Sequence, residues 1–63
     1  MVSKNVLNKT ILIRSNLNPY EEINQVFVTQ FSPNGNYFEV EYQVICKRQW
    51  LDINNFVVLD ILK

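Results

Sequence analysis

Few side chains in this sequence have the types and the spacing that catalysis needs. The chain has 63 residues and no histidine, the side chain that most often moves protons near neutral pH. Glu39 and Glu41 would lie on one face of a strand, about 7 Å apart, and two carboxylates held this way in a cleft can hydrolyse glycosides. Because carboxylates on an exposed strand face usually keep it hydrated, we expect no enzyme activity and no cofactor.

The single cysteine, Cys46, is the other candidate for chemistry. It precedes Lys47 and Arg48, and neighbouring cations can make a thiol reactive. No imidazole is present to act as its base, and strand alternation places Cys46 on the same inward face as Phe38 and Val40. We therefore interpret it as a small buried core residue. One thiol forms neither an internal disulfide nor a zinc site, so the sequence predicts no metal.

A second group of residues is suited to binding nucleic acid, because cations and aromatic rings together can hold a single strand. It comprises Lys47, Arg48, Trp50 and Tyr20. Six basic and six acidic residues cancel, which argues against strong attraction to nucleic acid or to an anionic membrane. Nucleic-acid binding is therefore an alternative function. Trp50 and Phe56 could also form an aromatic cage for a methylated cation, but we favour Trp50 as a plug at one end of the core.

Short strands separated by turns must position these side chains. A β-branched run, Lys9–Arg14, predicts the first strand, and Met1–Asn8 before it is a loose tail or an edge segment. The only glycine, Gly35, lies in a hairpin turn between two further strands. After the first strand the expected elements are strands at 25–31 and 37–46, a turn at 47–49, a short strand at 50–51, a turn at 52–55 and a strand at 56–62.

The segment after the first strand has two interpretations. Asn18 followed by Pro19 is typical of a helix start, which predicts a short helix near 19–25; the alternative is a proline turn. A longer helix from Pro19 to Phe31 competes with the strand at 25–31, since apolar residues recur there every four positions. The β-branched residues of that stretch favour the strand.

The elements predict a single all-β domain over residues 1–63, either a small barrel or an antiparallel meander of four to five strands. Its ending, Trp50-Leu51 followed by residues 53–57, resembles SH3 domains, in which a small turn precedes an aromatic–valine pair. The element order also resembles Tudor-like barrels. The acidic loop and the proline with which SH3 domains bind peptides have no convincing counterpart here, so the resemblance implies architecture and no function.

Apolar side chains exceed what one face of a thin sheet can bury. The residues assigned to the core are Ile11, Ile13, Val26, Val28, Phe38, Val40, Val44, Val57, Leu59 and Ile61, with Tyr42 and Cys46 on the same face. The apolar residues that then face the other way are Leu12, Phe27, Phe31, Tyr37, Ile45, Val58 and Leu62. Either residues 1–25 fold over this second face or a partner covers it.

We expect a non-enzymatic protein–protein interaction module, a small adaptor or inhibitor such as a host-modulating factor encoded by a phage or mobile element. The expected partner-binding residues surround the central hairpin: Phe27, Phe31, Tyr37, Glu39, Glu41 and Ile45. A homo-oligomer joined through edge strands is a further alternative. No apolar run suggests a signal peptide or a membrane span, so we expect a cytoplasmic protein without membrane contact.

Overall fold

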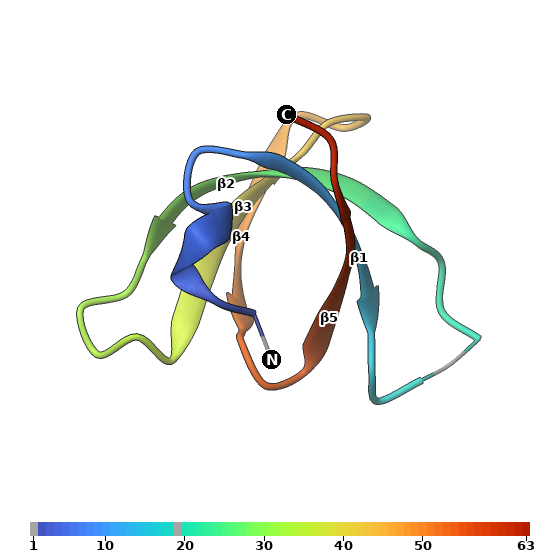
Figure 1. The fold of residues 1–63 in the computed structure, drawn as a ribbon. Coiled ribbons are helices and arrows are strands. Elements are labelled where there is room, and N and C mark those ends of the chain that lie inside the picture. The colour runs from blue at the N-terminus through green and yellow to red at the C-terminus, as the bar shows by residue number, and fades with distance from the viewer. Residues whose placement is uncertain (1, 19) are drawn as a thin grey trace.

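Alternating β-branched and aromatic residues build a five-stranded antiparallel sheet. The computed structural model describes residues 2–18 and 20–63. A 3-10 turn, η1 (Lys4–Val6), precedes the strands β1 (Thr10–Ser15), β2 (Asn24–Phe31), β3 (Tyr37–Tyr42), β4 (Lys47–Asp52) and β5 (Phe56–Ile61). Their order in the sheet is β4-β3-β2-β1-β5. The sheet curls around the core but stays unclosed (Figure 1). The all-β prediction is confirmed, as a meander whose last strand returns to the first.

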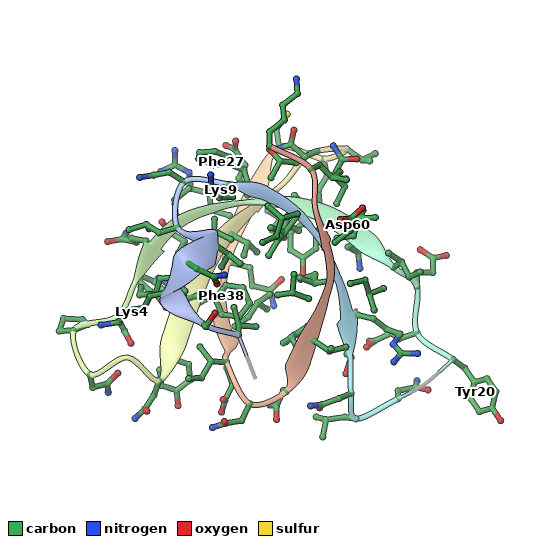
Figure 2. All side chains as sticks on the ribbon, in the orientation of Figure 1. Lys4, Lys9, Tyr20, Phe27, Phe38 and Asp60 are labelled. Carbon is green, nitrogen blue, oxygen red and sulfur yellow. The ribbon has the colours of Figure 1, made fainter. Side chains whose placement is uncertain are left out.

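The inner face of the curled sheet holds the core. Six predicted core residues of the first three strands are buried, namely Ile11, Ile13, Val26, Val28, Phe38 and Val40, and Tyr42 packs against them partly buried. Leu51 of β4 and Ile53 of the following turn join them. Figure 2 shows Phe38 pointing into the interior and Phe27 lying outside the ribbon. We call the side occupied by Phe27 the outer face.

The N-terminal segment belongs to this core. Val2 and Val6 are buried, and η1 lies in front of the interior of the curled sheet (Figure 1). The Val2 N–H donates to the Ile53 carbonyl at 3.0 Å, and the Asn8 N–H donates to the Val28 carbonyl at 2.9 Å. The segment is therefore not a loose tail. Its buried valines belong to the core cluster on the inner face. The N-terminal segment therefore does not cover the apolar residues of the outer face.

A bulge in β2 overturns the predicted orientation of Phe31. Val28 pairs with Val40 and Gln30 with Glu39, so Thr29 is left without a partner in β3. The extra residue reverses the alternation of inward and outward side chains after Thr29. Phe31 therefore packs against the core, and the centroids of its ring and the Phe38 ring lie 6.0 Å apart. The prediction that it faces outward was wrong.

A second irregularity overturns the prediction for β5. Leu12 pairs with Asp60 and Ile13 with Val58, so Leu59 is skipped. Phe56 and Val58 pack against the core, whereas Leu59 and Ile61 are exposed. Leu59 and Ile61 were therefore wrongly assigned to the core, and Val57, half-buried, is not among the residues of the core cluster.

The turn between β3 and β4 comes four residues earlier than predicted. Strand β3 ends at Tyr42, residues 43–46 form the turn, and β4 begins at Lys47, where we expected a turn. Cys46 has a positive φ of 53°, and its N–H donates to the Tyr42 carbonyl at 2.8 Å. Val44 and Cys46 are consequently exposed, and their assignment to the core was wrong.

The segment between β1 and β2 forms a turn and not a helix in its described part. The Asn18 side-chain oxygen accepts from the Tyr20 N–H at 3.0 Å, as an N-cap would, but β2 begins at Asn24. Pro19 lies outside the described residues. The strand at 25–31 is confirmed, and the longer helix through Phe31 is wrong. Within residues 2–18 and 20–63, no helix has the length and apolarity to cross a membrane.

Candidate functional site

The outer face brings together part of the predicted partner surface. Phe27 of β2 pairs with Glu41 of β3, and Glu41 pairs with Arg48 of β4, so the three side chains form a row across the sheet. In a neighbouring row Glu39 pairs with Trp50. The centre of this face is thus mixed in character, with carboxylates beside aromatic and basic side chains.

The other three predicted partner residues do not join the centre of this face. Phe31 belongs to the core. Tyr37 opens β3 and Ile45 follows its end, so they lie at opposite ends of the strand. The six residues from Tyr37 to Tyr42 alone span about 17 Å at the usual strand rise. The six predicted residues therefore do not form one site.

Ile45 instead belongs to a hollow at the end of the sheet, between the start of β2 and the β3–β4 turn. Its volume is about 540 Å³, within the range of roughly 300–1,000 Å³ common for binding sites. We call it the apolar hollow. Its lining residues are Leu12, Glu22, Ile23, Asn24, Gln25, Tyr42, Gln43, Val44 and Ile45. The exposed fractions of Ile23, Val44 and Ile45 are 57%, 93% and 63%.

One acidic residue lines the apolar hollow, and a second is its neighbour in the chain. Glu22 lines it, and Glu21 precedes it in the chain. Burial, followed by the negative charge of Glu21, raises the pKa of Tyr42, which also lines the hollow. Within the described part of the chain the one ion pair joins Arg48 and Glu41. Neither Glu21 nor Glu22 is paired there.

The two carboxylates considered for catalysis are engaged in other interactions. Glu39 accepts from the Thr29 hydroxyl at 2.7 Å and from the Gln30 amide at 3.1 Å. These hydrogen bonds, Thr29 first, lower the pKa of Glu39 despite some desolvation, and the charge of Arg48 adds to them. Glu41 lies 3.7 Å from the Arg48 Nε. A general acid needs a raised pKa, so the shift at Glu39 is opposite to the one that role requires.

The residues considered for nucleic-acid binding are only partly brought together. Arg48 and Trp50 share the outer face, opposite Glu41 and Glu39, whereas Lys47 lies on the other side of β4. Tyr20 projects from the tip of the loop between β1 and β2 (Figure 2). The two carboxylates beside Arg48 and Trp50 reduce the positive potential that phosphate contacts require.

The proposed aromatic cage and the proposed core role of Trp50 both fail on geometry. Phe56 packs edge-on against the core residue Phe38, with ring centroids 6.2 Å apart. Trp50 lies on the outer face and is 46% exposed. The two rings therefore face opposite sides of the sheet, and Trp50 does not plug the core.

Cys46 is a free thiol exposed at the surface. Its Sγ lies 3.9 Å from the Gln43 carbonyl within the same turn. Among residues 2–18 and 20–63, no group of three or more His, Cys, Asp or Glu side chains could hold a metal ion.

Sequence reasoning missed most of the apolar hollow because its residues come from three separate segments. Leu12 was recognised only as an outward residue, and Tyr42 and Val44 were assigned to the core. One signal was present: Val44 and Ile45 form an apolar pair between Gln43 and the cation pair Lys47–Arg48. A turn at this place would have exposed both side chains.

Comparison with known proteins identifies no relative of this chain. No family model matches the chain, and neither the curated proteins nor the solved structures contain a match.

Proposed function

We propose that this chain is a small non-enzymatic protein-interaction module, acting as an adaptor or inhibitor, and that the apolar hollow is its contact surface. The observation that carries the proposal is the exposure of Ile23, Val44 and Ile45 around one depression. Contiguous exposed apolar residues in a soluble protein usually mark an interaction site. A module of this kind needs no catalytic group.

The turn that presents Val44 and Ile45 is fixed by its backbone. Cys46 closes it with a positive φ and with a hydrogen bond to the Tyr42 carbonyl. A preformed turn loses little conformational freedom when a partner docks, which leaves more of the burial energy for affinity. The geometry thus favours Val44 and Ile45 as contact residues.

The partner we propose is a protein segment that inserts an apolar side chain and carries a cation beside it. The apolar part of the lining would receive the side chain. Glu21 and Glu22, neither of them in an ion pair within the described chain, would attract the cation. Opposite charges at the rim of an interface give specificity and faster association.

The test uses the whole chain as bait in a lysate of its source cells, together with two matched variants. Ile45→Asn places a polar side chain in the apolar hollow, and Tyr37→Asn makes the same kind of change at the opposite end of β3. Burying an isoleucine side chain contributes about 1.5–3 kcal/mol. We therefore expect Ile45→Asn to weaken partner binding at least about tenfold and Tyr37→Asn to leave it unchanged, as titration with the purified partner would show.

Three outcomes contradict this proposal. A partner that binds the Ile45→Asn variant as well as the original chain does not use the apolar hollow. A partner lost equally from both variants indicates a different or broader surface. Co-purified nucleic acid that binds with a steep salt dependence, detected by ultraviolet absorbance, would favour the alternative function.

A further inference from the structure

Strand β4 ends the sheet on one side with an open edge. It pairs with β3, and no strand of residues 2–18 and 20–63 lies on its other side. The Ile53 N–H donates to the Asn36 carbonyl, which identifies these two as a hydrogen-bonded pair of the ladder. Because such pairs alternate in antiparallel strands, Arg48, Trp50 and Asp52 turn their amide groups away from β3. In the described chain, the amide groups of Arg48 and Trp50 form no backbone hydrogen bond outside the sheet.

The same three residues place their side chains on the outer face. They pair with Glu41, Glu39 and Tyr37 respectively, all outward residues of β3. A basic side chain, an aromatic ring and an acidic side chain therefore follow one another at every second position: Arg48, Trp50, Asp52. Charges of opposite sign stand at equal distances on either side of the tryptophan.

We propose that β4 pairs with β4 of a second copy of this chain, antiparallel, about a twofold axis at Trp50. In this register Trp50 faces Trp50 of the second copy, and Arg48 faces Asp52 of the second copy on both sides. Directly opposite residues of antiparallel strands lie on the same face, so each of these pairs meets on the outer face. The six hydrogen bonds expected from three such pairs would join the two sheets into one of ten strands.

The charges select this register over its neighbours. An axis at Arg48 would place Arg48 against itself, and an axis at Asp52 would place two carboxylates together. With an axis at Gln49 or Leu51, neither Arg48 nor Asp52 would face a side chain of opposite charge. The Trp50 axis alone makes the edge complementary to itself, which a symmetric homodimer interface requires.

The groups involved can take part without dismantling the fold. The Arg48 side chain is 63% exposed, and its contact with Glu41 is long at 3.7 Å. Asp52 uses one carboxylate oxygen, Oδ1, to accept from the Asn54 N–H at 2.8 Å, which leaves Oδ2 for an arginine. The Asp52 carbonyl accepts from the Asn55 N–H and has a second lone pair. Trp50 would lose exposed surface.

The decisive experiment combines two charge reversals. Arg48→Asp gives a chain with acidic residues at both positions, and Asp52→Arg gives a chain with basic residues at both. Each variant alone opposes like charges and should weaken self-association at least about tenfold relative to the original chain. A one-to-one mixture restores opposite charges across the axis and should recover association. Sedimentation velocity measures all four samples, and circular dichroism checks the fold of each variant.

The results divide cleanly. Restored association in the mixture supports the proposal, and its failure in two folded variants overturns it. An original chain that stays monomeric at millimolar concentration, or that forms assemblies larger than a dimer, also overturns it. If either variant fails to fold, the fluorescence of Trp50, the only tryptophan, decides instead. Its emission should move to longer wavelength as the original chain is diluted, and emission independent of concentration would contradict the proposal.

Discussion

The two edge strands of this sheet, β4 and β5, differ in whether their outward N–H and C=O groups have hydrogen-bond partners. At the β4 edge, Arg48 and Trp50 direct their amide groups outward, and none of the described residues outside the sheet forms a backbone hydrogen bond with them. At the β5 edge the Leu62 N–H donates to the Thr10 carbonyl, so the preceding residue, Ile61, points away from β1. Its N–H donates to the Asp60 side chain at 2.9 Å. One edge is open, and the other is partly closed by its own side chain.

The edges also differ in their attachment to the core. Strand β4 is exposed over its first four residues and reaches the core at its end, through Leu51, which is buried and followed by the buried Ile53. Strand β5 contacts the core through Phe56 and Val58 at its beginning, and its last three residues are exposed. Free edges invite pairing with other chains unless charge, bulges or capping side chains discourage it. The comparison teaches that β5 is protected locally, whereas β4 carries a charge pattern that selects one partner.

The largest expected effect tests the difference in attachment. Leu51→Ala removes a buried side chain next to Phe38, and such deletions cost about 2–5 kcal/mol. Leu59→Ala makes the same kind of change in the skipped, exposed residue of β5, where about 0.5 kcal/mol or less is expected. Urea unfolding measures both free energies of unfolding. Equal losses would show that β5 is anchored as firmly as β4.

A smaller effect tests the closure of the β5 edge. Asp60→Ala removes the acceptor of the Ile61 N–H and leaves an edge of exposed apolar residues that can pair with other chains. We expect light scattering to rise faster with concentration than for the original chain. Asp60→Asn is the matched control, since it removes the charge but keeps a side-chain oxygen. Equal scattering from the two variants would assign the protection to charge and not to the hydrogen bond.

The sequence predicted the central part of the fold well because its signals there are local. Ile11 and Ile13, Val26 and Val28, and Phe38 and Val40 alternate in three strands, and all six are buried. Gly35 has a positive φ of 77° in the hairpin turn where it was expected. Alternation and turn chemistry each depend on a few neighbouring residues, so both can be recognised in one sequence.

The errors arise where one residue changes the alternation. Thr29 and Leu59 are each left unpaired, which turned Phe31 inward and left Ile61 exposed. Neither position differs from a regular strand residue in the sequence. The apolar alternation also continues past Tyr42 into Val44, so the pattern did not reveal the turn at 43–46. Only the pairing of strands distinguishes these cases.

The candidate site was predicted in part for the same reason. Ile45 was among the expected partner residues, and it lines the apolar hollow. Ile23 and Leu12 come from other segments and reach the hollow only through the pairing of β1 with β2. Properties of single side chains were accessible from the sequence, whereas their convergence depends on register.

The smallest effect concerns the electrostatics beside the open edge. Glu39 lies opposite Trp50 of β4, and hydrogen bonds from Thr29 and Gln30 lower its pKa below the ordinary value of 4.5. Because the folded pKa is the lower one, the stabilisation is complete above the unfolded pKa and is lost as the pH falls through the folded pKa. Carbon-detected NMR titration of the Glu39 carboxyl should give a midpoint below 4.5.

Two variants sharpen this prediction. Thr29→Val removes the hydroxyl that lowers the pKa most, so it should move the Glu39 midpoint upward further than Gln30→Ala does. A midpoint unchanged by Thr29→Val would mean that this hydroxyl does not lower the pKa of Glu39, which leaves the Gln30 amide and the positive charge of Arg48 as causes. If Gln30→Ala leaves the midpoint unchanged as well, only the charge of Arg48 remains, and Arg48 would then be engaged with β3 and less able to meet Asp52 of a second copy. The titration therefore reports on the availability of the β4 edge as well as on one carboxylate.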